Sequence, residues 1–205
     1  MANQERLRIY LIRHGEVEGA EDGRLLGRTD TPLSERGIAQ SRQLAERLAA
    51  VQLSAVYSSD LQRARTTAEI IAEGSKLKVQ ESFGWREIDM GEWEGRTFAE
   101  LQAVAPESVG RLFNDPASFR YPKGESFAAF TDRVQGALNQ LLIHHDQGDV
   151  ALVAHGGVNR AIVGAVLGIP MHNWLRLVQA YACLNIIDWY TGSPVLVSLN
   201  SAQYT

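Results

Sequence analysis

The sequence predicts a single three-layer α/β/α domain with a mostly parallel central sheet. Short apolar segments alternate with longer amphipathic segments along the 205 residues. A helix between two strands brings those strands into parallel pairing and places helices on both faces of the sheet. Two of the apolar segments end in histidine followed by glycine, at His14 and His155. No internal repeat or low-complexity segment divides the chain, so we expect one domain over residues 1–205.

The predicted strands are short, apolar and rich in β-branched residues. Residues 6–12 (RLRIYLI) alternate in character, as a strand with two different faces does. Residues 149–154 (DVALVA) are apolar after the first position, which suits a strand buried on both faces. The six predicted strands cover residues 6–12, 53–57, 77–80, 149–154, 182–190 and 195–199.

The predicted helices begin at residues that favour N-caps. Ser34 is an expected N-cap, the segment 58–60 (SSD) is expected to cap a second helix, and Thr97 with Glu100 matches a capping box. The helix after Thr97 should stop before Pro106. The predicted helices cover residues 34–50, 61–73, 98–105, 126–145 and 158–167.

Composition narrows the classes of function. Twenty Lys and Arg against 24 Asp and Glu give a net charge of −4, and no basic run is present, so nucleic-acid binding is not expected. No segment reaches the ~18 uninterrupted apolar residues of a membrane helix. Cys183 is the one cysteine, which excludes an internal disulfide. We expect a cytoplasmic protein that does not bind membranes.

Polar residues at two strand ends predict a binding site. In an open α/β sheet, ligands bind beyond the carboxyl ends of the strands, so His14 and His155 should face one crevice. Arg13 adjoins the first histidine, and Arg63 lies in the first turn of a predicted helix, where the dipole favours anions. Because guanidinium groups bind phosphate oxygens in pairs, this constellation predicts a site for a phosphoryl group.

Several segments resemble the histidine phosphatase superfamily, which includes cofactor-dependent phosphoglycerate mutases. The similarity covers roughly residues 7–170, and its blocks occur in the family's order. They are LIRHGE at 11–16, TPLS at 31–34, SSDLQRA at 58–64, EIDMG at 87–91, PKGES at 122–126 and VAHGG at 153–157.

The resemblance implies a role for each matching residue. His14 would be the nucleophile that becomes phosphohistidine, with its other ring nitrogen donating to a backbone carbonyl. Arg13 and Arg63 would hold the phosphate oxygens, and His155 would donate to the same oxygens.

Two further roles follow from the same resemblance. Glu87 would protonate the leaving alkoxide and then activate water, and the N–H of Gly156 would assist in phosphate binding. Because arginines supply the positive charge, neither a metal nor another cofactor is expected.

The sequence departs from the family in the first loop. Val17 and Ala20 stand where family members commonly have Thr and a phosphate-binding Asn. We therefore expect this loop to reach the phosphate through Gly27 or Arg28, with Arg24 as a further candidate. Residues 92–125 are expected to form a helical, lid-like insertion over the site.

The sequence leaves three functions open. The first is a metal-independent phosphomonoester hydrolase in the phosphatase branch, acting on small phosphorylated metabolites, with α-ribazole 5′-phosphate as the most specific candidate. The second is a cofactor-dependent phosphoglycerate mutase, and the third is a non-catalytic phospholigand-binding module. Trp174 is assigned either to the core or to a subunit contact in a homodimer.

Overall fold

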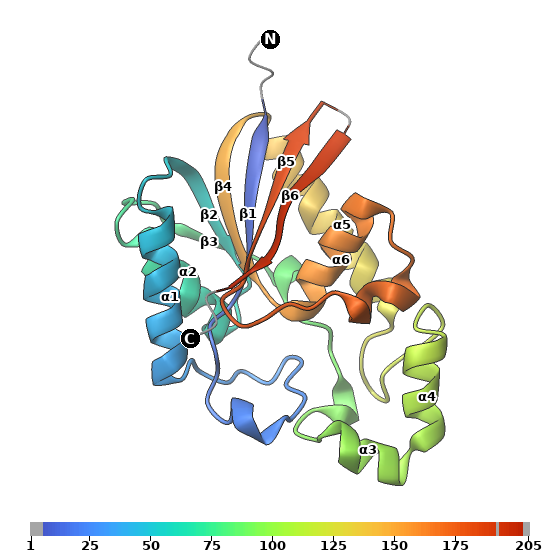
Figure 1. Cartoon of the computed structure of the whole chain (residues 1–205). Coiled ribbons are helices and arrows are strands. Elements are labelled where there is room, and N and C mark those ends of the chain that lie inside the picture. The colour runs from blue at the N-terminus through green and yellow to red at the C-terminus, as the bar shows by residue number, and fades with distance from the viewer. Residues whose placement is uncertain (1–5, 192, 203–205) are drawn as a thin grey trace.

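The central sheet has its six strands in the order β3-β2-β4-β1-β5-β6 in the computed structural model, which describes residues 6–191 and 193–202 (Figure 1). Strands β1 to β4 pair in parallel, whereas β5 and β6 pair antiparallel. This confirms the predicted mostly parallel α/β sheet. The strands are β1 Leu7–Arg13, β2 Leu53–Ser58, β3 Val79–Glu81, β4 Gly148–Ala154, β5 Leu184–Tyr190 and β6 Ser193–Ser201.

The helices form two outer layers and a separate group beyond the sheet. Helices α1 and α2 lie on one side of the sheet, and α5 and α6 lie on the other (Figure 1). Helices α3 and α4 lie beyond the end of the sheet toward which β1 and β4 run (Figure 1). The helices are α1 Glu35–Leu48, α2 Gln62–Ala72, α3 Phe98–Val104, α4 Pro106–Asn114, α5 Phe127–His144 and α6 Gly156–Leu167, with 3-10 turns η1 Ala20–Asp22, η2 Phe83–Trp85, η3 Gly91–Trp93 and η4 Met171–Arg176.

The alternation of side chains along β1 divides the core between the two layers. Leu7, Ile9 and Leu11 pack in the cluster that contains α5 and α6. Tyr10 and Ile12 pack in the cluster that contains α1 and α2. Because successive side chains of a strand point to opposite faces, both faces must be covered to keep these residues from water.

Two N-cap predictions, at Ser34 and Thr97, are confirmed, one is corrected, and Ser126 is a further N-cap. Ser34 and Ser126 accept from the N–H groups of the third helical residues, and Thr97 with Glu100 forms the capping box. The segment 58–60 does not cap α2 as expected. Ser59 Oγ accepts from Leu61 N, before the helix, and the first helical N–H, of Gln62, donates to Asp30.

An ion pair explains why residues 58–60 do not cap α2. The Asp60 carboxylate accepts two hydrogen bonds of 2.7 Å from Arg86, so it is not available to the helix. Two other elements also differ from expectation. Helix α4 begins with Pro106 at its first position, where proline costs no hydrogen bond, and α6 begins two residues early, at Gly156.

The pairing of β1 with β4 positions the two histidines. The register pairs Arg13 with Ala154, and His14 N donates to Ala154 O. His14 and His155 therefore leave neighbouring strands at the same edge. Within the described ranges, no helix is both long enough and apolar enough to span a membrane.

We predict that the α5 side of the core carries much of the stability. Leu138 is 1% exposed, so Leu138→Ala should lower the free energy of unfolding by about 2–5 kcal/mol. Ile143 on the same helix is 74% exposed, and Ile143→Ala should change it by less than about 0.5 kcal/mol. Urea unfolding of both variants checks this. Equal effects would contradict the described packing of α5.

Candidate active site

His14 is buried and held in one tautomer. It is 4% exposed, and its Nδ1 lies 2.7 Å from Gly15 O. A carbonyl only accepts, so Nδ1 carries the proton and Nε2 keeps its lone pair. Burial, with further effects from Arg63 and Arg13, holds the pKa of His14 well below its usual 6.5. The predicted hydrogen bond to a backbone carbonyl is confirmed.

A close backbone contact fixes the segment that carries His14. A Cβ on Gly15 would overlap the carbonyl of Gly37 in α1, and a Cβ on Gly37 would overlap the carbonyl of Glu16. Gly15 N also donates to Thr67 Oγ1 of α2, at 3.2 Å. Glycine at both positions lets the two backbones approach to a distance that any side chain would prevent.

His155 lies at the N-cap of α6 and is fully buried. Its ring centroid is 5.1 Å from that of His14. Burial and the nearby Arg63 hold the pKa of His155 well below 6.5, so the ring is neutral. Neither ring nitrogen has a hydrogen-bond partner in the part of the chain that the structure describes. Such buried groups are costly and point to a ligand.

Two arginines bring positive charge to these rings. Arg63 is 1% exposed, and its Nη atoms donate to Thr29 O and Gly27 O, at 2.7 and 2.6 Å. Arg13 Nη1 donates to Gln179 O at 2.6 Å. The Nε of each arginine is buried and has no partner among the described residues.

Backbone carbonyls, and not carboxylates, hold these guanidinium groups. Neither Arg13 nor Arg63 forms an ion pair within residues 6–191 and 193–202. A buried charge without a counter-ion is unfavourable until an anion arrives. Two free Nε–H donors beside two neutral imidazoles therefore form an anion site.

Glu87 contacts the N-terminus of α6. Its two oxygens accept from Ile88 N at 2.9 Å and from Gly157 N at 2.8 Å. A Cβ on Gly157 would overlap the Glu87 carboxylate, so glycine is needed for this approach. The carboxylate is thus fixed while one edge lines a pocket with apolar walls, formed by Ile88, Met90, Tyr121, Phe127, Phe130, Gly157, Arg160, Trp174 and Leu175.

The three predicted substrate-binding residues lie in different settings. The Gly27 carbonyl accepts from Arg63, and its φ of +49° favours glycine. Arg28 Nη atoms bind Asp89 and Glu125, at 3.2 and 3.4 Å. A Cβ on Gly156 would lie 3.6 Å from Arg13 Nε, so the bare backbone keeps space open there. Direct substrate contact by these residues stays a prediction.

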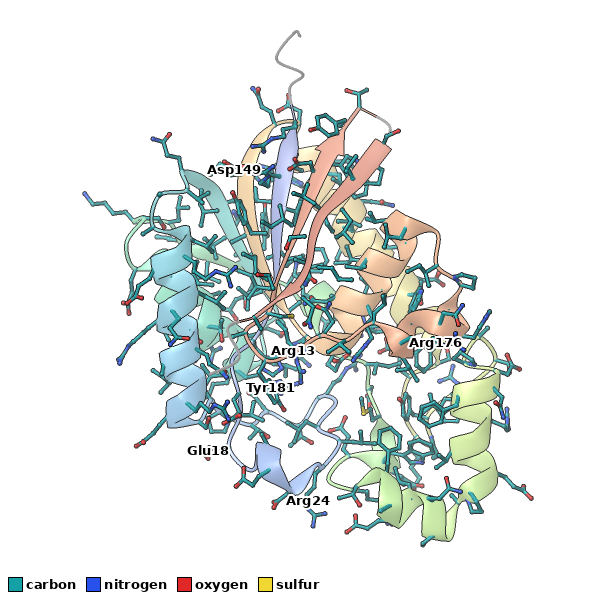
Figure 2. All side chains as sticks on the ribbon, in the orientation of Figure 1. Arg13, Glu18, Arg24, Asp149, Arg176 and Tyr181 are labelled. Atoms are coloured by element: carbon teal, nitrogen blue, oxygen red, sulfur yellow. The ribbon has the colours of Figure 1, made fainter. Side chains whose placement is uncertain are left out.

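The loop that departs from the family is organised by Glu94. Its carboxylate accepts from the backbone N–H groups of Arg28, Thr29 and Met90. Arg24 instead donates to Gly95 O and points away from the sheet (Figure 2). Arg24 is therefore not placed to bind a ligand at His14.

Several residues against the site were not found in the sequence. Tyr181 lies under the Arg13 guanidinium, 3.9 Å from the ring centroid, and Gln179 binds the same group (Figure 2). No motif surrounds either residue, and both lie more than 160 positions after Arg13, so no local signal could have found them. Trp174 is 7% exposed and its indole N–H donates to Ile169 O, so it belongs to the core.

The fold and the site define an α/β protein with a histidine-based anion site at the carboxyl edge of its sheet. The model of the histidine phosphatase superfamily (branch 1) matches residues 9–202, and the chain belongs to that superfamily. This confirms the resemblance drawn from the sequence and identifies the chain as a phosphatase of the superfamily.

Three similar proteins illustrate the range of this family. A protein of Proteus mirabilis described as "probable phosphoglycerate mutase GpmB" is 35% identical over 94% of this chain and 89% of its own length. "Phosphoserine phosphatase 1" of Hydrogenobacter thermophilus is 33% identical over 95% and 92%. A crystal structure of a "putative alpha-ribazole-5'-P phosphatase" from Escherichia coli superposes with a TM-score of 0.87 at 30% identity, over 97% and 98%.

We predict that the buried neutral histidines make stability depend on pH. Above pH 6.5 the two imidazoles are neutral in the folded and in the unfolded protein, so they do not change the free energy of unfolding with pH. As the pH falls through 6.5, the unfolded chain binds protons that the folded site excludes. The free energy of unfolding should then fall by up to about 1.4 kcal/mol per pH unit for each histidine.

Chemical denaturation between pH 7 and about pH 5 checks this for the wild type, His155→Asn and His172→Asn. Loss of the buried imidazole in His155→Asn should make the fall in stability less steep, whereas His172 is exposed and its variant should follow the wild type. Identical slopes for all three proteins would contradict a neutral His155.

Proposed function

We propose that this phosphatase is a metal-independent phosphomonoester hydrolase that acts through a phosphohistidine at His14. The observation that carries the proposal is the pair of guanidinium groups of Arg13 and Arg63. Among the described residues, their buried Nε–H donors have no partner and neither group has a carboxylate partner. A phosphoryl dianion supplies the missing negative charge. The neutral His14 Nε2 beside them is the nucleophile.

The first step transfers the phosphoryl group to His14. The Nε2 lone pair forms the P–N bond while the P–O bond to the leaving group breaks in line. The leaving oxygen takes a proton from Glu87. Nδ1–H continues to donate to Gly15 O, so the phosphorylated ring keeps its orientation.

The second step returns the enzyme to its starting state. Glu87 accepts a proton from water, the water oxygen bonds to phosphorus, and the P–N bond breaks. Arg13, Arg63 and His155 donate to the three equatorial oxygens in both steps, in positions fixed before the reaction. The N-terminus of α6 at Gly156 adds the favourable end of a helix dipole.

We propose a small phosphorylated metabolite as substrate, with α-ribazole 5′-phosphate as the specific candidate. Two observations support this choice. The pocket beside Glu87 has mainly apolar and aromatic walls, which suits the body of an organic leaving group. A structure similar over nearly the whole chain is named for that activity. Helices α3 and α4 of the predicted insertion at 92–125 would close over this pocket as a lid.

Phosphoglycerate mutase activity is the second candidate, since a 35% identical relative is described as a mutase. A mutase returns the phosphoryl group from histidine to its product instead of to water. Net conversion of 3- to 2-phosphoglycerate, with a bisphosphoglycerate primer, would favour it. Phosphate binding without any turnover would favour the third candidate, a binding module.

We predict that loss of the His14 imidazole abolishes turnover. His14→Ala should reduce kcat on p-nitrophenyl phosphate by at least about 10³-fold, because no nucleophile remains. The wild type and His172→Ala, a change at an exposed histidine, should keep full activity in EDTA. Turnover that survives in His14→Ala, or that EDTA removes, would contradict the proposed route.

Glu87→Gln should separate substrates by their leaving groups. An alkoxide needs a proton from Glu87, so the single-turnover rate of phosphohistidine formation from α-ribazole 5′-phosphate or an alkyl phosphate should fall about 10²- to 10⁴-fold. The p-nitrophenolate ion leaves without a proton, so loss on p-nitrophenyl phosphate should be less than about tenfold in single-turnover formation of phosphohistidine. Equal losses on both substrates would exclude Glu87 as the acid.

A further inference from the structure

The chain makes a tight turn beside the site at residues 179–183. Arg13 N donates to Cys183 O at 3.1 Å, and Ala182 N donates to His14 O at 3.0 Å. The turn therefore continues the pairing of β1 with β5 up to the candidate nucleophile. Cys183 N donates to Ala180 O, and Ala182 has a φ of +52°, a strained conformation for alanine.

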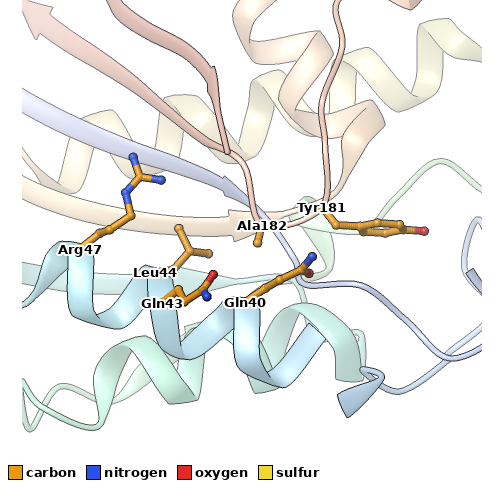
Figure 3. Close-up of a pocket in the computed structure, with 6 residues that line it drawn as sticks. All are labelled: Gln40, Gln43, Leu44, Arg47, Tyr181 and Ala182. Atoms are coloured by element: carbon orange, nitrogen blue, oxygen red, sulfur yellow. The ribbon is translucent and has the colours of Figure 1, made fainter. Parts of the chain in front are cut away.

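This turn contacts the Arg13 side chain at two points. Gln179 O accepts from Arg13 Nη1 at 2.6 Å, and the Tyr181 ring lies against the face of the guanidinium. Figure 3 shows Ala182 facing Gln40 of α1 while the Tyr181 ring extends away from it. One Nη and one face of the guanidinium are held, which fixes the orientation of the buried Nε of Arg13, an atom without a partner among the described residues.

A buried pair of amides holds the turn in place. Asn185 Nδ2 donates to Gln179 Oε1 at 2.8 Å, and Gln179 Nε2 donates to Asn185 Oδ1 at 3.0 Å. The two residues are 0% and 2% exposed. Asn185 also donates to Leu11 O in β1, so the pair is anchored in the sheet.

Asn200 secures the turn from the neighbouring strand. Its backbone N–H donates to Asn185 Oδ1 at 2.9 Å, and its side-chain Oδ1 accepts from Ala180 N at 2.8 Å. At the far end of the turn, Cys183 Sγ donates to Gln179 Oε1 at 3.3 Å. The amide pair is thus connected to β1, to β6 and to both ends of the turn.

We propose that the Gln179–Asn185 amide pair is a positioning device for Arg13. It fixes the carbonyl and the ring that aim the guanidinium at the phosphoryl group. The inference rests on the proposed function, in which Arg13 binds that group. A free arginine side chain loses rotamer freedom when it is fixed. Here the turn has fixed it before the substrate binds, so less of this freedom remains to be lost on binding.

Three variants separate positioning from stability. Gln179→Met and Asn185→Leu each remove one amide of the pair, while the remaining amide keeps other hydrogen bonds, from Asn185 Nδ2 to Leu11 O or from Gln179 Nε2 to Val178 O. We measure Tm, the Kd for inorganic phosphate and kcat/KM for p-nitrophenyl phosphate. Each single variant should weaken phosphate binding at least about tenfold and lower kcat/KM about 10- to 100-fold. The double variant should lose no more affinity and rate than the weaker single variant, because the two amides act on Arg13 as one unit.

Gln135→Met is the matched control, because Gln135 forms an amide pair of 2.9 Å with Asn139 on the exposed surface of α5. It should leave the affinity and the rate unchanged. The proposal is overturned if the single variants bind phosphate within twofold of the wild type. It is also overturned if the losses of affinity and rate simply follow the loss of Tm across the three variants, since the role would then be structural.

Asn200→Gly keeps the test possible if the buried variants do not fold. Asn200 has a φ of +51°, which glycine adopts readily, so the change removes the acceptor for Ala180 N and keeps the backbone. Phosphate affinity should fall about three- to tenfold, and an unchanged affinity would overturn the proposal. A wild type that binds phosphate without turnover would refute the proposed function alone, since the phosphate Kd still tests the amide pair.

Discussion

The parallel pairing of β1 with β4 is the constraint on which the rest of the site depends. It joins the two strands that are buried on both faces, and its register brings His14 beside Ala154 and His155. Two imidazoles more than 140 residues apart in the sequence thereby come to a centroid distance of 5.1 Å. The helices on either face keep water away from this edge, and the same exclusion keeps both rings neutral.

The site also requires guanidinium groups that are held in position without a carboxylate that would neutralise their charge. Carboxylates bind Arg28 and Arg86, which lie at the rim, whereas carbonyl groups bind Arg13 and Arg63 in the centre. A carbonyl satisfies a donor and fixes its direction but leaves the unit charge available to a ligand. Loops from distant parts of the chain supply these carbonyl groups, so the loops are part of the site even where their side chains do not face it.

Much of the fold and of the site could be predicted from the sequence. Strands, caps and the edge position of both histidines follow from local patterns, and the tautomer of His14 follows from its proposed role. The contacts of Gln179 and Tyr181 could not be predicted, because they depend on how an antiparallel strand returns along β1. The failed cap at residues 58–60 has a similar cause, since a distant Arg86 competes for Asp60. The capping preference of the local sequence does not include a competing partner from a distant part of the chain.

The contact between Gly15 and Gly37 affects the local unfolding of the segment that carries His14. The segment after β1 is joined to α1 by this contact and to α2 by the Thr67 hydroxyl. A local fluctuation that released the segment would have to separate it from both helices at once. The amide of Gly15 should therefore exchange with solvent deuterium only in the global unfolding event, as the slowest amides of the central strands do. The proposed nucleophile, His14, would then lie in the most cooperative part of the protein, although it belongs to a loop.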